Sequence, residues 1–570
     1  MSANSTPRMP ELDLLVRGGT VVDGSGLPAY TADVGMRDGR VVAVGRLGDA
    51  PAARTVDADG CVVAPGFVDI HTHYDAQLHF EPTASPSSWH GVTTVITGNC
   101  GFSLFPARAD DVGWLCDMLS RVEGMSPATL AEGVGFAGGG MHDFAAGIDG
   151  RIGVNVGLQV GHCALRRYVL GDDAGTRTAT DLEIESMQDL LRTALDEGAV
   201  GFSSSQLDLH VDQHGKPVPS NLAAADELVA LAAVFADRPH GVIEFISRSN
   251  LEGHDEADRK LMLAMCEASG KPLNVNPIVN LPTLGDGWKR GLEFVDEARA
   301  AGHRVHPQSQ LQQMQVFFAL HDTFLFDEMP EFREVLTAGD RREALLRDPE
   351  VRDRLRAAFA HTEGRTLVFS WESVKVARAD EHPEWIGRTV AELARELGSD
   401  PFDTFLDTSL AEHLRTTFTL GGSLGAASRR TTEEVVRHPA SLPGSSDAGA
   451  HLTSYCGVDY STRLLSEYVP DVISLEEAVR RLATIPAQLY GFADRGWLGA
   501  GARADLVVWD PHSLGVGATR WAEDFPAGGG RFVVEAIGYR ALVVNGEVVR
   551  ADGVDTGARP GRVLSPRAAP

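Results

Sequence analysis

The stretch APGFVDIHTHYDAQ, residues 64–77, indicates the fold of this chain. Its first half is an apolar run of the kind that forms a buried parallel strand, and His71 and His73 follow that run directly. Because successive side chains of a strand point to opposite faces, residues two positions apart project to the same face, and both imidazoles can reach one metal ion. The alternative is a pair of hydrogen-bonded loop histidines, and we favour metal binding over it.

Apolar strand-like runs alternate with amphipathic helical runs along the middle of the chain, which is typical of a parallel sheet covered by helices. The carboxyl ends of eight such strands are expected at or near His71, Cys100, His162, Ser203, Glu244, Asn276, His306 and Asp447. Eight β/α units predict a (β/α)8 barrel, a fold whose functional residues lie at the carboxyl ends of the strands.

Other segments differ from this pattern. Both ends of the chain carry short β-branched runs separated by turn residues, which predicts small β units, and the last residues look like a surface tail. The interval between His306 and Asp447 is too long for a single crossover. We interpret its middle, residues 317–400 approximately, as an insertion over the barrel mouth and a candidate lid.

The composition excludes several classes of protein. The 570 residues are 43% hydrophobic and 23% charged, which is ordinary for a globular protein. A net charge of −28 repels nucleic acid and anionic membranes, so we expect neither of those partners. The partner that we expect, from the site residues described below, is a small-molecule substrate. With no leader-like start and no long apolar run, the chain is expected to be soluble and cytoplasmic. The six cysteines lack paired spacing, so we expect no disulfide framework, and nothing indicates the oligomeric state.

Two further residues add to the histidine pair. Asp447 lies in the turn GSSDAGAH, where a carboxylate could bind a metal ion and accept a proton from water. A lone Asp in such a turn is usually a helix N-cap, and the His71/His73 pair favours the metal site. Cys100 ends the run TTVITGNC, and its thiol could bind Zn²⁺ at the barrel mouth or pack in the core.

These motifs resemble the amidohydrolase superfamily and, within it, the N-acyl-D-amino-acid deacylase (D-aminoacylase) family. The resemblance covers residues 14–564 and rests on APGFVDIHTHYDAQ, VTTVITGNCGFS, VGHCALR, GSSDAGAH, GWLGAGARADLVVWD and VVNGEVVRADGVDTGARPGRVL. It implies zinc-dependent hydrolysis of an amide bond. It also implies a barrel over residues 65–494 and a small β-sandwich assembled from residues 1–64 and 495–570.

The resemblance also assigns the metal site and shows where this chain departs from the family. By motif, the ligand positions fall on His71, His73, Cys100 and Asp447, with Asp447 also the catalytic base. The family's fifth strand ends in a Thr-His-Met-Arg-like run and its sixth in Ser-His-x-Lys, whose histidines bind zinc.

This chain has GVIEFISR and LNVNPIVN instead, which put Ile246 and, approximately, Pro277 at the two histidine positions. The lysine that helps to hold a substrate carboxylate is also missing. The tight zinc site made by Cys and two His therefore cannot form as it does in the family.

Two arrangements could replace the missing ligands. Glu244 lies on the same strand face as the first missing histidine, so its carboxylate could bind the metal, or it could be a salt-bridged strand end. Alternatively, His71, His73 and Asp447 hold one ion with water, as in open catalytic zinc sites. We prefer one Zn²⁺, or another divalent ion, per chain, with Glu244 and Cys100 as optional extra ligands.

Further polar residues near the expected strand ends are candidates for substrate binding. His162 and His306 could hydrogen-bond the substrate or a developing oxyanion, and the alternative for each is a structural histidine. Arg166 and Arg248 could hold a substrate carboxylate as a guanidinium fork, although a surface salt bridge is the default for a lone arginine. His210 follows the fourth strand in a polar loop and is expected to be solvated.

The sequence thus predicts a metal-dependent amidohydrolase with a metal-activated water and Asp447 as general base. One alternative is hydrolysis of a cyclic amide, an imide or another C–N bond, which the missing lysine motivates. A catalytically degenerate barrel that binds a ligand or partner is another alternative, motivated by the missing histidines. The retained His71, His73 and Asp447 argue against degeneracy.

Overall fold

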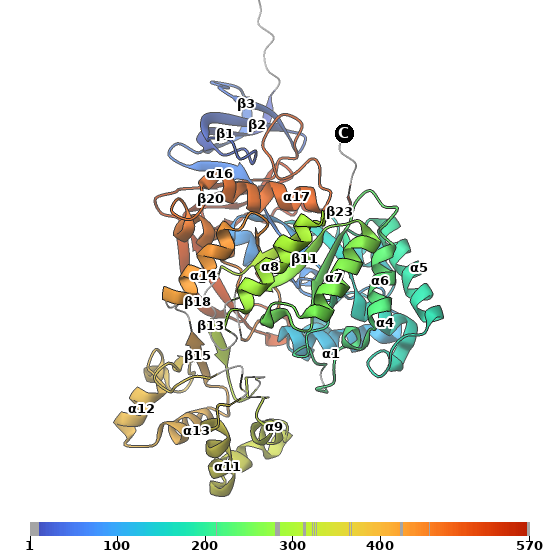
Figure 1. Cartoon of the computed structure of the whole chain (residues 1–570). Helices are drawn as coiled ribbons and strands as arrows, with labels where there is room; N and C mark the ends of the chain where they lie inside the picture. Colours follow the sequence, from blue (N-terminus) through green and yellow to red (C-terminus); the bar gives the residue numbers. More distant parts are fainter. Residues whose placement is uncertain are drawn as a thin grey trace, which may run out of the picture. The chain divides into compact units, whose positions relative to one another are not determined.

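A computed structural model gives the structure of the chain and divides it into two compact units, and Figure 1 labels many of their helices and strands. The first unit comprises Met1–Gln312, Ala427–Leu452 and Cys456–Pro570, and the second comprises Gln313–Ala426 and Thr453–Tyr455. The structure describes residues 11–212, 214–279, 285–311, 315–321, 323, 325–326, 328–363, 365, 368–421, 426–454 and 457–566.

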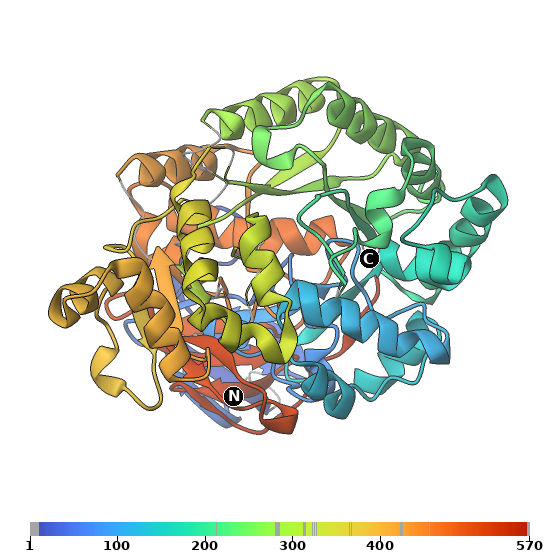
Figure 2. The same cartoon turned by 90° about the horizontal axis from the view of Figure 1, so that it is seen from below.

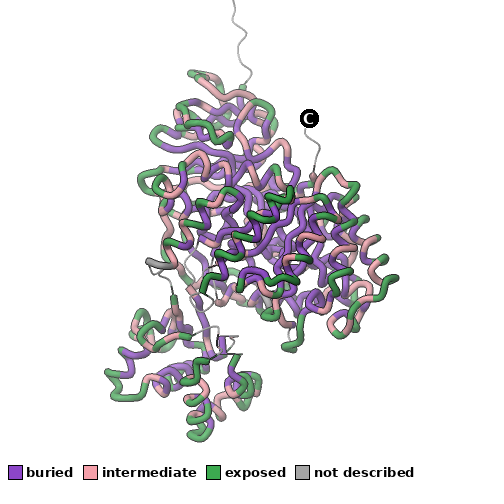
Figure 3. The backbone as a smooth tube through the Cα atoms, viewed as in Figure 1, coloured by how far each residue is buried: buried purple, intermediate pink, exposed green. Residues whose placement is uncertain are grey.

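Eight parallel strands form the barrel of the first unit, which confirms the predicted fold class. They pair in chain order as β6 (Phe67–Asp69), β7 (Val92–Thr97), β8 (Asn155–Gly161), β9 (Gly201–Ser205), β10 (Val242–Ile246), β11 (Leu273–Ile278), β12 (Val305–Ser309) and β16 (Leu442–Pro443). Buried residues dominate these strands, as Figure 3 shows, because helices cover the sheet. Past the strand ends, the His73 N–H donates to the Ala448 carbonyl at 2.7 Å, which joins the first strand to the last.

Helices follow the strands along the chain, and in Figure 2 the green and teal helices lie outside the green strands. Local signals explain their ends: in the longest of them, Thr180 and Glu183 form a capping box at the start, and Gly198 ends the helix in a left-handed conformation. The helices of this unit are α1 (Val112–Glu123), α2 (Pro127–Gly133), α3 (Met141–Ile148), α4 (His162–Leu170), α5 (Asp181–Glu197), α6 (Ala225–Ala233), α7 (Glu256–Ser269), α8 (Gly287–Ala300), α14 (Ala426–Arg437), α15 (Tyr460–Arg463), α16 (Leu475–Val479) and α17 (Ile485–Leu489).

The two ends of the chain share one mixed sheet, which confirms a β domain built from both termini. Its central pairing is antiparallel and places Leu506 opposite Pro65 and Trp509 opposite Val62. The strands are β1 (Leu12–Val21), β2 (Tyr30–Arg37), β3 (Arg40–Gly45), β4 (Ala52–Asp57), β5 (Val62–Pro65), β17 (Leu506–Trp509), β20 (Tyr539–Val544), β21 (Glu547–Ala551) and β22 (Val554–Asp555), and β18 (Gly515–Ala522) pairs separately with β19 (Arg531–Ile537).

The predicted surface tail is wrong for two of its residues. Val563 and Leu564 form β23, which pairs in parallel with β8, where Val563 lies opposite Val156. Leu564 is buried in this position, so burial of an apolar side chain and two paired backbones hold the segment against the barrel.

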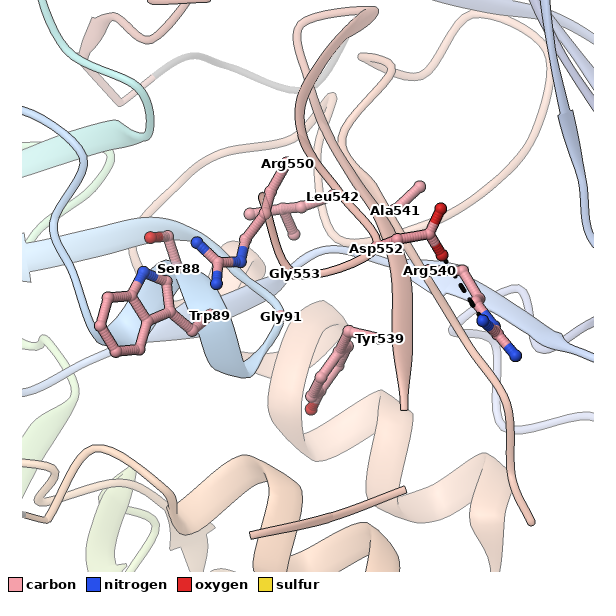
Figure 4. A pocket seen from close by; sticks show the side chains of 10 residues that line it. All are labelled: Ser88, Trp89, Gly91, Tyr539, Arg540, Ala541, Leu542, Arg550, Asp552 and Gly553. Carbon is pink, nitrogen blue, oxygen red and sulfur yellow. Dashed lines mark ion pairs between the residues drawn. The ribbon is translucent and has the colours of Figure 1, made fainter. Parts of the chain in front are cut away.

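A small cavity lies beside the junction of the barrel and the β domain (Figure 4), and its lining includes Trp89, Tyr539 and Arg550. The Arg550 guanidinium lies over the Trp89 indole at 5.0 Å from the ring centroid. The cavity holds about 10 Å³, which is room for about one water molecule, so it is too small for a substrate.

The second unit has a core of its own. A three-stranded antiparallel sheet orders β13 (Gln315–Phe318), β15 (Thr417–Gly421) and β14 (Lys375–Arg378). Helices α9 (Pro330–Leu336), α10 (Arg342–Arg347), α11 (Pro349–Ala360), α12 (Val390–Leu397) and α13 (Pro401–Ala411) complete it. Its buried cluster is rich in phenylalanine and includes Phe318, Phe326, Phe332, Phe405 and Phe418. The predicted lid role of this segment stays a prediction. Across the described residues of both units, no helix has the length and hydropathy needed to cross a membrane.

Candidate metal and catalytic site

Three buried side chains at the ends of β6 and β7 bring their donor atoms together: His71, His73 and Cys100. The His71 Nε2 lies 3.3 Å from the His73 Nε2 and 3.3 Å from the Cys100 Sγ, and the Sγ lies 3.7 Å from the His73 Nε2. Ligands bound to one tetrahedral zinc ion at the usual bond lengths lie about 3.3–3.7 Å apart. The donor types and their spacing therefore fit one zinc ion.

Asp447 lies next to this donor group. Its Oδ1 is 3.0 Å from the His71 Nε2 and 3.7 Å from the His73 Nε2. The Asp447 side chain is 28% exposed, against 2% for His71 and 4% for His73, so the carboxylate lies between the donor group and solvent. Burial opposes ionisation, but the hydrogen bond and charge of His71 and the bond with His73 hold the pKa of Asp447 well below its usual range.

The backbone around the donor group is strained in a way that functional sites often show. Cys100, Ser445, Asp447 and His451 all have positive φ angles, of 55°, 53°, 48° and 51°. Non-glycine residues adopt this region rarely, and the surrounding structure has to hold them there. At Gly449, φ is 91° and an added Cβ would lie 2.6 Å from the His73 carbonyl oxygen, so only glycine fits this turn.

Other residues hold the two histidines in place, and the sequence analysis missed them. The Ser446 hydroxyl donates to the His71 carbonyl at 2.9 Å, and the Gln308 Nε2 lies 3.4 Å from the His71 Nδ1. On the far side, the Glu123 Oε1 lies 3.0 Å from the His73 Nδ1. Strand alternation could have found Gln308 had the end of β12 been placed correctly, but no local signal marks Glu123.

Glu244 supports the site without joining the donor group. Its Oε2 accepts the Cys100 N–H at 2.9 Å, and its Oε1 accepts from the Asn276 side chain. Burial raises the pKa of Glu244 to about 7. The positions of the family's missing histidines, Ile246 and Pro277, offer no donor side chain at the ends of β10 and β11.

Two acids flank the histidine pair on β6 and the following loop. Burial raises the pKa of Asp69 to about 7 and that of Asp75 to about 6. Asp69 Oδ1 accepts the His71 N–H at 3.4 Å, and Asp75 Oδ2 accepts the Gly98 N–H at 3.1 Å. Each acid lies two residues from one of the histidines, which the sequence already shows. Their hydrogen bonds to the main chain stabilise the ends of β6 and β7.

The structure does not bring His162 and Arg166 to the donor group. Both are fully buried, and both pair with Glu227 of α6: the His162 Nε2 lies 2.9 Å from its Oε1, and the Arg166 Nη1 donates to that oxygen at 2.6 Å. The His162 Nδ1 also contacts the Ser204 hydroxyl at 2.8 Å. In this network the polar atoms of both residues bond to protein partners, and substrate binding by His162 and Arg166 stays a prediction.

The other two predicted substrate residues are also placed elsewhere. His306 lies near the start of β12, two residues before Gln308, and its Nδ1 lies 3.2 Å from the Ala440 carbonyl oxygen. The strand therefore continues past the end that we expected, and Gln308 takes the place nearer the donor group. Arg248 forms a surface ion pair with Asp208 and donates to the Asn221 carbonyl at 3.3 Å, the default for a lone arginine.

His210 is nearer the site than expected. Its ring packs 5.2 Å from Phe102, whose ring is 6.3 Å from that of His73, and its Nδ1 lies 2.9 Å from the Ser205 hydroxyl. Burial, with the charges of His451 and His73, lowers the pKa of His210 to about 3. His210 is thus a loop residue, as expected, but it is only partly exposed and packs against Phe102.

The described cysteines are unpaired. Cys61, Cys100, Cys116, Cys163 and Cys266 are buried free thiols, and Cys456 lies outside the described residues. Cys100 is the member of this set that belongs to the donor group.

Comparison with known proteins places the chain in a family. The model of the amidohydrolase family matches residues 54–550. The N-acyl-D-glutamate deacylase of Alcaligenes xylosoxydans xylosoxydans is 30% identical over 97% of this chain and 96% of that protein. The chain is also similar to the crystal structure of N-acyl-D-glutamate deacylase from Bordetella bronchiseptica, which is complexed with zinc and a phosphonate mimic of the tetrahedral intermediate. The TM-score is 0.64 and the identity is 28%, and the match covers 98% of this chain and 100% of that one. A second similar structure is that of a D-aminoacylase with a binuclear metal centre, described as having one-metal activation and second-metal attenuation. Its TM-score is 0.66 and its identity is 26%, and the match covers 97% of this chain and 100% of that one.

Proposed function

Because the chain belongs to the amidohydrolase family, we propose that it hydrolyses an amide C–N bond of a small molecule, as N-acyl-D-amino-acid deacylases do. The observation that carries this proposal is the position of Asp447, with its Oδ1 3.0 Å from the His71 Nε2 and its side chain partly open to solvent. Metal-assisted hydrolysis of an amide requires residues that can bind the metal ion and an accessible carboxylate beside them.

The residues that would hold the metal are His71, His73, Asp447 and Cys100, and their donor types suit one zinc ion. When bound, a divalent ion at this position acts as a Lewis acid and makes water a stronger nucleophile. One ion per chain is sufficient here, because β10 and β11 offer no histidine at their ends. The one-metal activation described for a D-aminoacylase supports the same stoichiometry.

Asp447 performs the proton transfers in the proposed reaction. Its side chain is 28% exposed and its Oδ1 lies 3.0 Å from the His71 Nε2, so a carboxylate at this point can accept a proton from the attacking water. The water oxygen bonds to the carbonyl carbon, the C–N bond breaks, and Asp447 returns the proton to the leaving nitrogen. Asp447 has a left-handed backbone conformation, and its Oδ1 lies 3.0 Å from the His71 Nε2.

Metal analysis and a substrate panel test the proposal together. Protein purified without chelator or a histidine-rich tag is expected to carry about one zinc ion per chain, lost in His71→Ala, and to release amino acid from N-acyl-D-amino acids. A protein that stays metal-free after incubation with zinc would instead be a degenerate ligand-binding barrel, and the proposal would be wrong.

One observation favours a second substrate class, the cyclic amides and imides. The two arginines that we expected to hold a substrate carboxylate are occupied: Arg166 pairs with Glu227 and Arg248 pairs with Asp208. A ring substrate needs no carboxylate fork. Turnover of cyclic amides, with none of N-acyl-D-amino acids, would select this class.

A further inference from the structure

Glu123 is a buried acidic residue beside His73. It is the last residue of α1, its side chain is 1% exposed, and its Oε1 lies 3.0 Å from the His73 Nδ1. Within the described part of the chain, His73 is its one ion-pair partner. A buried acid needs a compensating partner, and among the described residues His73, with the metal ion that it would bind, is in place to supply one.

The main chain fixes the position of Glu123 independently of its side chain. Gly124 ends α1 in a left-handed conformation, with φ of 68°, and the Glu123 carbonyl accepts the Leu452 N–H at 3.1 Å. Leu452 ends the segment that carries Asp447. Glu123 therefore joins the end of α1, His73 and the Asp447 segment, and its carboxylate has little freedom to move away from the imidazole.

The contact determines which nitrogen of His73 is available. The Glu123 Oε1 and the His73 Nδ1 lie at ion-pair distance without a hydrogen bond between them, and a carboxylate oxygen this close favours the imidazole tautomer with its proton on Nδ1. The Nε2 then presents its lone pair toward the His71 Nε2, 3.3 Å away, and the Cys100 Sγ, 3.7 Å away.

We propose that Glu123 is a positioning residue that holds His73 in its metal-binding tautomer and raises the affinity of the site for the metal. This inference rests on the proposed function, because it concerns the same metal site. A carboxylate behind a ligating histidine fixes its orientation and increases its basicity, and loss of such a partner typically lowers metal affinity about 10–100-fold. Glu123 does not contact the substrate in this account.

The test measures Zn²⁺ affinity of the metal-depleted full-length chain by competition with a chromophoric chelator. Glu123→Gln is expected to weaken Zn²⁺ binding about 10–100-fold. Asp117→Asn is the matched control, because Asp117 lies on the same helix with its side chain exposed, and its affinity is expected to equal that of the unmodified protein. The visible spectrum of bound Co²⁺ is expected to change in Glu123→Gln and not in Asp117→Asn.

Three outcomes separate this inference from the proposed function. Equal Zn²⁺ affinity and equal Co²⁺ spectra in folded Glu123→Gln and unmodified protein would overturn the role of Glu123 and leave the proposed function standing. No Zn²⁺ binding by the unmodified protein would overturn both. If Glu123→Gln does not fold, Glu123→Asp keeps the charge one methylene farther away, and unchanged affinity in that variant would also contradict the inference.

Discussion

Asp447 meets two demands that no other described residue at the donor group combines. It contacts both histidines, and 28% of its side chain remains open to solvent. A buried carboxylate could hold a metal ion, but it could not exchange protons with water and an incoming substrate. In this position Asp447 has a strained backbone φ of 48°. Such a conformation persists only where the surrounding structure holds it in place.

Asp447→Asn is expected to lower kcat about 10²–10⁴-fold, because an amide cannot accept the proton that the reaction releases. The metal content is expected to fall less than in His71→Ala, since the side-chain oxygen remains. Steady-state rates with the best substrate of the panel, measured beside elemental analysis, check both. Full activity of Asp447→Asn would rule out its role as general base.

Among the elements, the turn after β16 decides the geometry of the site. It carries Asp447, joins the first strand through the His73 N–H bond to the Ala448 carbonyl, and passes so close to His73 that a side chain at Gly449 has no room. The first and last strands of the barrel therefore meet through the residues that hold the metal. The same contacts therefore join the ends of the barrel and position the site.

Gly449→Ala is expected to lower metal affinity and activity together, because its Cβ would lie 2.6 Å from the His73 carbonyl oxygen and would push the turn away from that strand. Gly302→Ala is the matched control: its φ of 94° imposes similar backbone strain, but an added Cβ meets nothing within 4 Å. Zinc affinity and thermal unfolding are measured for both variants. A loss of stability in both reports the backbone strain, and a loss of zinc affinity in Gly449→Ala alone reports displacement of the turn. Equal metal affinities would show that the turn moves without disturbing His73.

At the scale of the whole barrel and β domain, His90 joins three separate parts of the chain. Its Nδ1 lies 2.7 Å from the Thr462 hydroxyl of α15, its Nε2 lies 3.2 Å from the Val534 carbonyl oxygen of β19, and the Tyr539 hydroxyl donates to its carbonyl at 3.0 Å. Burial lowers the pKa of His90 to about 3. The neutral ring is thus part of the junction between the barrel and the sheet at the chain's ends.

His90 makes this junction sensitive to acid. Its folded-state pKa lies below the ordinary value of 6.5, so the unfolded chain binds more protons, and the stability from neutral His90 is complete above pH 6.5 and is lost as pH falls toward 3. His90→Gln cannot titrate, so its deficit in unfolding free energy is expected to shrink by about 2–3 kcal/mol between pH 6.5 and 4.5.

Denaturant titrations at several pH values test this, with His142→Gln as the control because His142 is exposed on the surface of α3. A constant difference between His90→Gln and the unmodified protein across this pH range would contradict the neutral, buried His90.

The sequence by itself determined the architecture and the first part of the site. The alternation of apolar and amphipathic runs predicted eight parallel strands, because periodicity is a local property that each segment carries. The spacing of His71 and His73 likewise predicted a shared face, and the turn GSSDAGAH predicted a carboxylate nearby. These features depend on neighbours in the chain, so the chain displays them.

Only the tertiary structure decided what surrounds these residues. Glu123 is brought to His73 from the end of a helix, and Glu227 binds His162 and Arg166 from another, over distances in sequence that no local pattern records. The end of β12 was misplaced because periodicity marks the existence of a strand better than its last residue, and Gln308 was missed with it. The polar partners of a buried site come together only when the chain packs in three dimensions. No periodic pattern in the sequence indicates which residues they are.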